Sequence, residues 1–200
     1  MRRRSDAEGA GGGDDSGGGV TVQLFKQKDR NAKGKGHPIL FGLPEAEHFN
    51  DFPEGGGYPH GFLSRAYAIL GVTDVTKVLH VCSGSMRIGL CVDIRPETTP
   101  TLVANAQQLP FRDGTFLWVM ADPPYSAEYA RNLYQTEAVY PNPHSLMAEC
   151  LRVTAENGRV GFMHHIVPKF RRPSRLVKVF GITQGPGYNI RAWTVIEKHA

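Results

Sequence analysis

The chain of 200 residues has few cysteines and no long apolar run. Its three cysteines, Cys82, Cys91 and Cys150, show no CxxC spacing and no histidine in metal-ligand register. We therefore expect neither a disulfide framework nor a metal site, and a reducing, cytoplasmic location. No apolar stretch approaches ~18 residues, and no hydrophobic segment follows the MRRR start, which predicts neither a signal peptide nor a membrane span.

Residues 2–19 also hold no apolar side chain larger than that of alanine. Seven of the 23 glycines fall there, and such a stretch cannot bury enough surface to offset the entropy of ordering it. We expect residues 1–19 to be a disordered tail and residues 20–59, short apolar pieces broken by Gly and Pro, to be an irregular arm. Residues 60–200 would then form one domain, without a separate recognition domain.

Positive charge is concentrated in two segments, although the net charge is only +4. Residues 26–35 hold five positive charges and one negative charge, and residues 169–175 include Lys169, Arg171 and Arg172. Such residues contact the phosphates of nucleic acids without reading their sequence. A solvated basic face has the same composition, so both interpretations stay open.

The apolar spacing predicts alternating helices and strands. Apolar residues recur at helical spacing over 62–70 before Gly71, and again over 144–154. Strands are expected at 77–82, 90–94, 101–105, 116–121 and 159–167, and 175–184 and 189–198 flank GPGY as a hairpin. The expected fold is α/β, a mostly parallel sheet that binds its ligand at the carboxyl ends of the strands and finishes in an antiparallel hairpin.

The sequence Asp122-Pro123-Pro124-Tyr125 follows directly on the strand predicted at 116–121. Two prolines in succession stiffen the turn and remove two backbone donors, which leaves carbonyl groups as acceptors. The carboxylate and the carbonyls suit an amino group, and the aromatic ring suits a flat partner. A nucleobase with an exocyclic amine matches that combination.

This DPPY segment resembles motif IV of the amino-methylating class I S-adenosylmethionine (SAM) methyltransferases, which act on adenine or cytosine. VLHVCSGS at 78–85 resembles the glycine loop of motif I, and Asp93 ends the next strand, where the family has an acid for the ribose hydroxyls. The resemblance runs in order through residues 60–198 and implies a Rossmann-like fold. It assigns SAM binding to Cys82, Ser83, Gly84, Ser85, Asp93, Ile94, Asn105, Ala106 and Gln107.

The sequence departs from the family at the glycine loop. His80 stands where relatives have an acid, and Gly84 alone remains of the usual glycines, with Cys82 and Met86 at the other positions. We interpret His80 as a hydrogen-bonded core residue. Only eight residues separate Gly84 from Asp93, fewer than the dozen or more of an ordinary parallel connection, so the first crossover should be shortened.

The resemblance implies direct methyl transfer, with Asp122, Pro123, Pro124 and Tyr125 as the catalytic residues. The Asp122 carboxylate and the Pro123 carbonyl would accept hydrogen bonds from the amine, and Tyr125 would stack on the base. Tyr129, Lys169, Arg171 and Arg172 are weaker substrate candidates. The tyrosine-rich segment from Tyr125 to Tyr140 is either a lid or an amphipathic helix that packs on the core, and one of His164 and His165 would point toward the substrate.

The expected partner is nucleic acid, DNA rather than RNA, with a specificity partner or a second copy of the chain supplying target selection. Two alternatives stay open: a class I methyltransferase for small molecules or protein side chains, which LPFRDGTF at 109–116 favours, and a degenerate methyltransferase fold that only binds. Asp93 and the complete DPPY segment argue against the second alternative.

Overall fold

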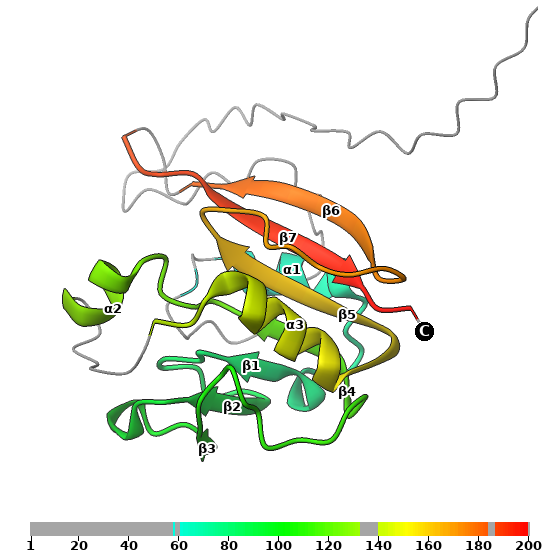
Figure 1. Cartoon of the computed structure of the whole chain (residues 1–200), viewed down its shortest axis with the longest axis horizontal. Helices are drawn as coiled ribbons and strands as arrows, with labels where there is room; N and C mark the ends of the chain where they lie inside the picture. The colour runs from blue at the N-terminus through cyan, green and yellow to red at the C-terminus, as the bar shows by residue number, and fades with distance from the viewer. Residues whose placement is uncertain (1–57, 59–60, 133–139, 184–186, 200) are drawn as a thin grey trace, which may run out of the picture.

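The computed structural model describes residues 58, 61–132, 140–183 and 187–199; the tail expected at 1–19 and nearly all of the arm expected at 20–59 lie outside them. The described residues form a seven-stranded sheet of order β3-β2-β1-β4-β5-β7-β6 (Figure 1). The strands are β1 (Leu79–Val81), β2 (Leu90–Asp93), β3 (Leu102–Val103), β4 (Phe116–Ala121), β5 (Thr154–His164), β6 (Arg175–Ile182) and β7 (Arg191–Glu197).

The first five strands pair in parallel, whereas β7 runs antiparallel between β5 and β6. Each expected strand is present, and β4 has the expected bounds. The predicted fold, a mostly parallel α/β sheet that ends in an antiparallel hairpin, is therefore confirmed.

Helices cover both faces of this sheet. Helix α1 (Phe62–Leu70) buries its apolar side with Trp193 and Val195, and α3 (Pro143–Val153) buries its apolar side with Leu79 and Val160 on the opposite face (Figure 1). The remaining helices are α2 (Ala127–Asn132) and the short 3-10 helices η1 (Val75–Lys77) and η2 (Pro96–Thr98). As the sequence predicts, α1 ends at Gly71, whose φ of 73° favours glycine.

The first crossover is as short as the sequence predicts. Residues 82–89 join β1 to the parallel strand β2, and none of them is helical. Eight residues are enough because β1 and β2 are only three and four residues long, a rise of about 10–13 Å. The return depends on Gly89, which has a φ of 74°; a Cβ atom there would lie 2.4 Å from the Val78 carbonyl oxygen.

Residues 156–158, Glu-Asn-Gly, separate the helix expected at 144–154 from the strand expected at 159–167, and they lie within β5 as an irregularity. Phe116 pairs with Thr154 and Trp118 with Arg159, so the four residues 155–158 of β5 lie opposite the single residue Leu117 of β4, and Asn157 has a φ of 60°. Strand β5 thus begins immediately after α3, five residues earlier than the sequence pattern indicates.

One edge of the sheet collects the elements that carry the predicted chemistry. The carboxyl ends of β1, β4 and β5 meet there, and the antiparallel β7 begins at this edge because Ala192 pairs with His164. Helix α2 lies beyond the same edge (Figure 1). Among the described helices, none combines the length and apolar character needed to cross a membrane.

Candidate functional site

The DPPY segment begins where β4 ends, between β1 and β5. The amide of Asp122 donates to the Val81 carbonyl at 3.3 Å, which extends the pairing of β4 with β1 by one residue. The Tyr125 hydroxyl donates to Asp122 Oδ1 at 2.9 Å. Burial raises the pKa of Asp122 to about 6, although the Tyr125 hydrogen bond and the Arg191 charge lower it. At neutral pH the site thus holds a partly desolvated carboxylate.

Arg191, the first residue of β7, reaches this segment from the other end of the sequence. Its Nη1 lies 3.3 Å from the Tyr125 hydroxyl oxygen, across 66 residues of chain. Sequence reasoning missed this residue. One signal in the sequence could have indicated Arg191. The last strand is predicted to be antiparallel, so its first residues lie at the edge where the parallel strands end.

A second set of hydrogen bonds holds the backbone of the DPPY segment. The Ile166 amide donates to His164 Nδ1 at 3.2 Å, so the neutral ring carries its proton on Nε2. That nitrogen lies 3.2 Å from the Tyr140 hydroxyl, which donates to the Tyr125 carbonyl at 3.3 Å. Burial, with His165 and His144 nearby, lowers the pKa of His164 to about 4. His164 is therefore neutral at physiological pH and supports the segment through Tyr140.

His165 covers the ring of Tyr125. The two ring centroids are 4.5 Å apart with an interplanar angle of 35°, and the Tyr129 ring lies 6.2 Å from that of Tyr125. His165 is exposed, and Tyr129 is 44% exposed. Tyr129 thus does not pack into the core as the amphipathic-helix interpretation required. The segment 133–139, which holds Leu133 and Tyr134, lies outside the described residues.

The glycine loop after β1 is joined to the end of β2. The Gly84 amide donates to Asp93 Oδ2 at 2.9 Å, and the Arg95 amide and Nε donate to Oδ1 at 2.9 and 3.2 Å. Cys82 and Gly84 have positive φ values of 56° and 53°, which turn the chain sharply at this point. Asp93 is only 5% exposed and thus shapes this loop. The loop, residues 82–85, includes Ser83 and Ser85 and is the one that the sequence assigns to the cofactor.

The third cofactor segment follows β3, the neighbour of β2 in the sheet. Asn105 accepts the Gln107 amide at 2.9 Å through its side-chain oxygen, and Ala106 is buried. Ile94, next to Asp93, is 41% exposed and presents an apolar side chain beside this segment. The structure therefore brings all three predicted cofactor segments to one edge.

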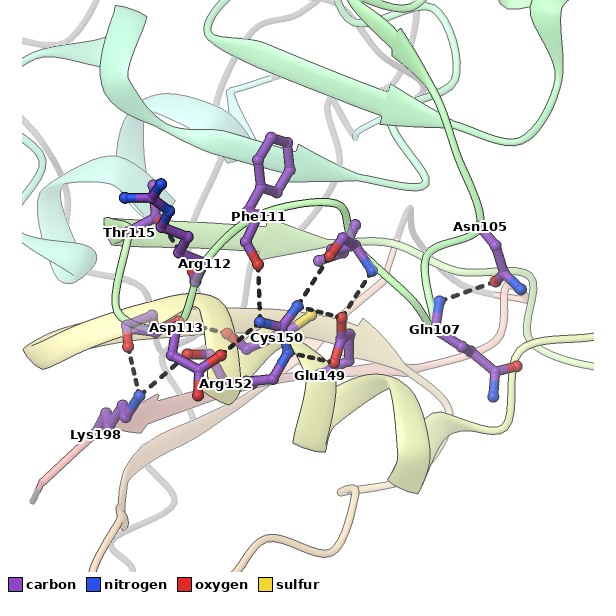
Figure 2. A network of polar contacts seen from close by, with 12 residues as sticks. Asn105, Gln107, Phe111, Arg112, Asp113, Thr115, Glu149, Cys150, Arg152 and Lys198 are labelled. Carbon is purple, nitrogen blue, oxygen red and sulfur yellow. Dashed lines mark hydrogen bonds and ion pairs between the residues drawn. The ribbon is translucent and has the colours of Figure 1, made fainter.

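Arg152 of α3 holds the continuation of this segment (Figure 2). Its guanidinium donates to the carbonyl oxygens of Leu109 and Phe111 at 2.9 and 2.8 Å, and pairs with Asp113 and Glu149 at 2.6 and 2.7 Å. Glu149 also accepts the Leu109 amide at 2.7 Å. Sequence reasoning missed both residues of α3, because charged side chains at i and i+3 of a helix usually indicate only a solvated face.

The remaining predicted residues lie outside these networks. Lys169, Arg171 and Arg172 are exposed on the connection between β5 and β6, where the Lys169 amide donates to His144 Nδ1 at 3.0 Å. His80 is buried and its Nε2 lies 3.1 Å from the Tyr67 hydroxyl, which confirms it as a core residue. Burial lowers the pKa of His80 to about 4. Across the part of the chain that the structure describes, no His, Cys, Asp and Glu side chains gather as a metal site.

Comparison with known proteins gives remote likenesses only. No protein-family model matches the chain, and no curated protein matches it. Among solved structures, TrmN from Thermus thermophilus is similar at 17% identity and a TM-score of 0.46, over 66% of this chain and 46% of its own. A SAM-dependent methyltransferase from Aquifex aeolicus is similar at 12% identity and a TM-score of 0.43, over 66% of this chain and 87% of its own.

A third solved structure is the 1,6-didemethyltoxoflavin-N1-methyltransferase of Burkholderia thailandensis, with bound S-adenosylhomocysteine. It is 13% identical, with a TM-score of 0.44, over 68% of this chain and 77% of its own. Identities below 20% and TM-scores below 0.5 establish neither activity nor substrate for this chain, which spans less than half the length of TrmN.

Proposed function

We propose that this chain is a SAM-dependent methyltransferase that transfers a methyl group to an exocyclic amino group of adenine or cytosine in nucleic acid. The observation that carries the proposal is the DPPY segment at the carboxyl end of β4, with the half-buried Asp122, whose carboxyl group accepts the Tyr125 hydroxyl. Asp122, Pro123, Pro124 and Tyr125 are the proposed catalytic residues.

The residues at the ends of β1, β2 and β3 suit SAM. Asp93 has a carboxylate for the ribose hydroxyls and four lone-pair sites, of which Gly84 and Arg95 occupy only part. The exposed apolar side chain of Ile94 and the loop of Asn105, Ala106 and Gln107 suit a flat adenine ring. Residues 82–85 would hold the methionine part, and the bound cofactor supplies a methyl group on a sulfonium.

Asp122 has the chemistry to activate an amine. Its Oδ1 accepts the Tyr125 hydroxyl, and within the described residues no hydrogen bond occupies Oδ2. A carboxylate oxygen that accepts an N–H of the amine favours the form in which the nitrogen lone pair is localised. The effect is strengthened here because the carboxylate is half-buried, and the same desolvation raises its pKa to about 6.

Aromatic side chains at this edge, together with exposed basic side chains on the connection from β5 to β6, support a nucleobase of a nucleic acid, and DNA before RNA is the proposed target. Tyr125, Tyr129 and His165 form a group of rings, and Lys169, Arg171 and Arg172 are exposed for phosphates. A specificity partner or a second copy of the chain would select the target.

A binding module without activity is the second candidate, favoured by one observation. Both oxygens of Asp93 and Oδ1 of Asp122 accept hydrogen bonds from within the chain. This arrangement is also stable without a ligand. Titration of the protein with SAM by calorimetry is the first test that separates the two candidates. If SAM at millimolar concentration does not bind, the methyltransferase proposal is contradicted.

Labelled SAM offered together with DNA, RNA and a cell extract tests the substrate. We expect label in nucleic acid, recovered after digestion as methylated adenine or cytosine; label confined to small molecules or protein contradicts the proposal. Asp122→Ala should abolish transfer and leave SAM affinity within about tenfold. Glu156→Ala removes an exposed carboxylate and is the matched control. Transfer that survives Asp122→Ala moves the chemistry away from the DPPY segment.

A further inference from the structure

Arg191, Tyr125 and Asp122 form a hydrogen-bonded series whose direction is defined by chemistry. A guanidinium only donates hydrogen bonds, and an ionised carboxylate only accepts them. The Tyr125 hydroxyl between them therefore accepts from Arg191 Nη1 at 3.3 Å and donates to Asp122 Oδ1 at 2.9 Å. With Arg191 in place, the hydroxyl hydrogen is directed at the carboxylate.

The start of β7 holds Arg191 in register with the sheet. It pairs with Ile182 of β6, and the next residue, Ala192, pairs with His164 of β5. Trp193 is fully buried, with its ring 5.3 Å from that of Phe62 and 5.4 Å from that of Phe180. The backbone that carries Arg191 is therefore anchored in the core that α1 covers.

We propose that Arg191 is a positioning residue that acts through the Tyr125 hydroxyl to keep Asp122 an oriented carboxylate acceptor. The use of that carboxylate on an amine rests on the proposed function. The series itself depends only on the three side chains, so it can be measured without substrate.

Charged and titratable groups from several elements surround the Asp122 carboxyl. Tyr125 lies on its own segment, Arg191 on β7 and Cys82 on the loop after β1, and Tyr58 approaches from before α1. Burial raises the pKa of Asp122 to about 6, and Tyr125 and Arg191 both lower it. Loss of Arg191 must therefore raise this pKa, and the carboxylate is then lost at a higher pH as the solution is acidified.

The experiment follows the Asp122 carboxyl carbon by NMR during pH titration of full-length protein labelled with ¹³C-aspartate. Asp122→Asn assigns the signal. We expect Arg191→Met and Tyr125→Phe each to raise the titration midpoint by at least about half a pH unit, and Arg191→Lys to restore part of the shift. In the double variant the rise should be smaller than the sum, because both changes break one series.

Arg175→Met is the matched control, because Arg175 pairs with Glu197 at 2.9 Å, at the other end of the same hairpin. Glu197 is six residues from Arg191, about 20 Å along a strand, so this variant should leave the midpoint in place. A folded Arg191→Met protein with an unchanged midpoint overturns the proposal, and so does full additivity in the double variant. If the protein transfers no methyl group, the titration still decides the role of Arg191, so the two failures are distinct.

Discussion

The two halves of the sheet hold their loops in different ways. In the half assigned to the cofactor, β1, β2 and β3 have three, four and two residues, whereas β4, β5, β6 and β7 have six, eleven, eight and seven. Short strands offer few pairing hydrogen bonds. Asp93 and Arg152 therefore hold the loops of the first half, and long paired strands hold the DPPY edge of the second.

We expect the largest loss of stability from a substitution at Gly89, because this residue closes the shortened crossover between β1 and β2. In Gly89→Ala the new Cβ would lie 2.4 Å from the Val78 carbonyl oxygen, at a φ of 74°. We expect the free energy of unfolding to fall by more than about 4 kcal/mol, since both backbone strain and overlap with a neighbouring backbone contribute. Urea denaturation followed by circular dichroism measures the change.

Gly187→Ala is the matched control for this change. Gly187 has a φ of 83° and nothing within 4 Å of a new Cβ, so only the strain of about 1–2 kcal/mol should remain. If the two variants were equally stable, the crossover would not depend on the close approach at Gly89.

Arg152→Met should weaken the same half by a smaller amount. The change removes two ion pairs and two hydrogen bonds to loop carbonyls from a side chain that is 32% exposed. We expect a loss of about 2 kcal/mol in the free energy of unfolding, and SAM affinity about fivefold lower because the loop from Asn105 is less well held. Denaturation and calorimetry measure the two effects.

The control for Arg152→Met is Arg112→Met, an exposed arginine of the same loop. It should change stability by less than about 0.5 kcal/mol. Equal effects of the two variants would mean that the network in Figure 2 does not hold the loop.

Tyr140→Phe should reduce stability less than Gly89→Ala or Arg152→Met. Its effect should fall on the DPPY segment, in the second half of the sheet. It removes the hydroxyl between His164 and the Tyr125 carbonyl, which lie within 3.2 and 3.3 Å of it. We expect about 1 kcal/mol less stability, and kcat about tenfold lower with the KM for SAM unchanged, because the DPPY backbone is held less firmly. A rise in the KM for SAM at constant kcat would assign Tyr140 to the cofactor half instead. Tyr188→Phe, on a side chain that is 63% exposed, is the control for stability.

The fold was predictable because its signals are local. The apolar run at 116–121, the helix closed by Gly71 and the hairpin around GPGY each depend on neighbours in sequence, and the structure confirms them. The start of β5 was not predictable from its turn residues. Asn157 and Gly158 mark a turn in most sequences, but here their backbones pair with Lys198, which keeps the chain within the sheet.

The sequence by itself determined the α/β order, the buried His80, the short crossover and the place of the DPPY segment, because contiguous residues carry each of them. Only the tertiary structure decided that Arg191 reaches Tyr125 across 66 residues and that Arg152 reaches Phe111 across 41. Contacts of this kind depend on strand order and register, which arise from packing of the whole core and leave no local pattern in the chain.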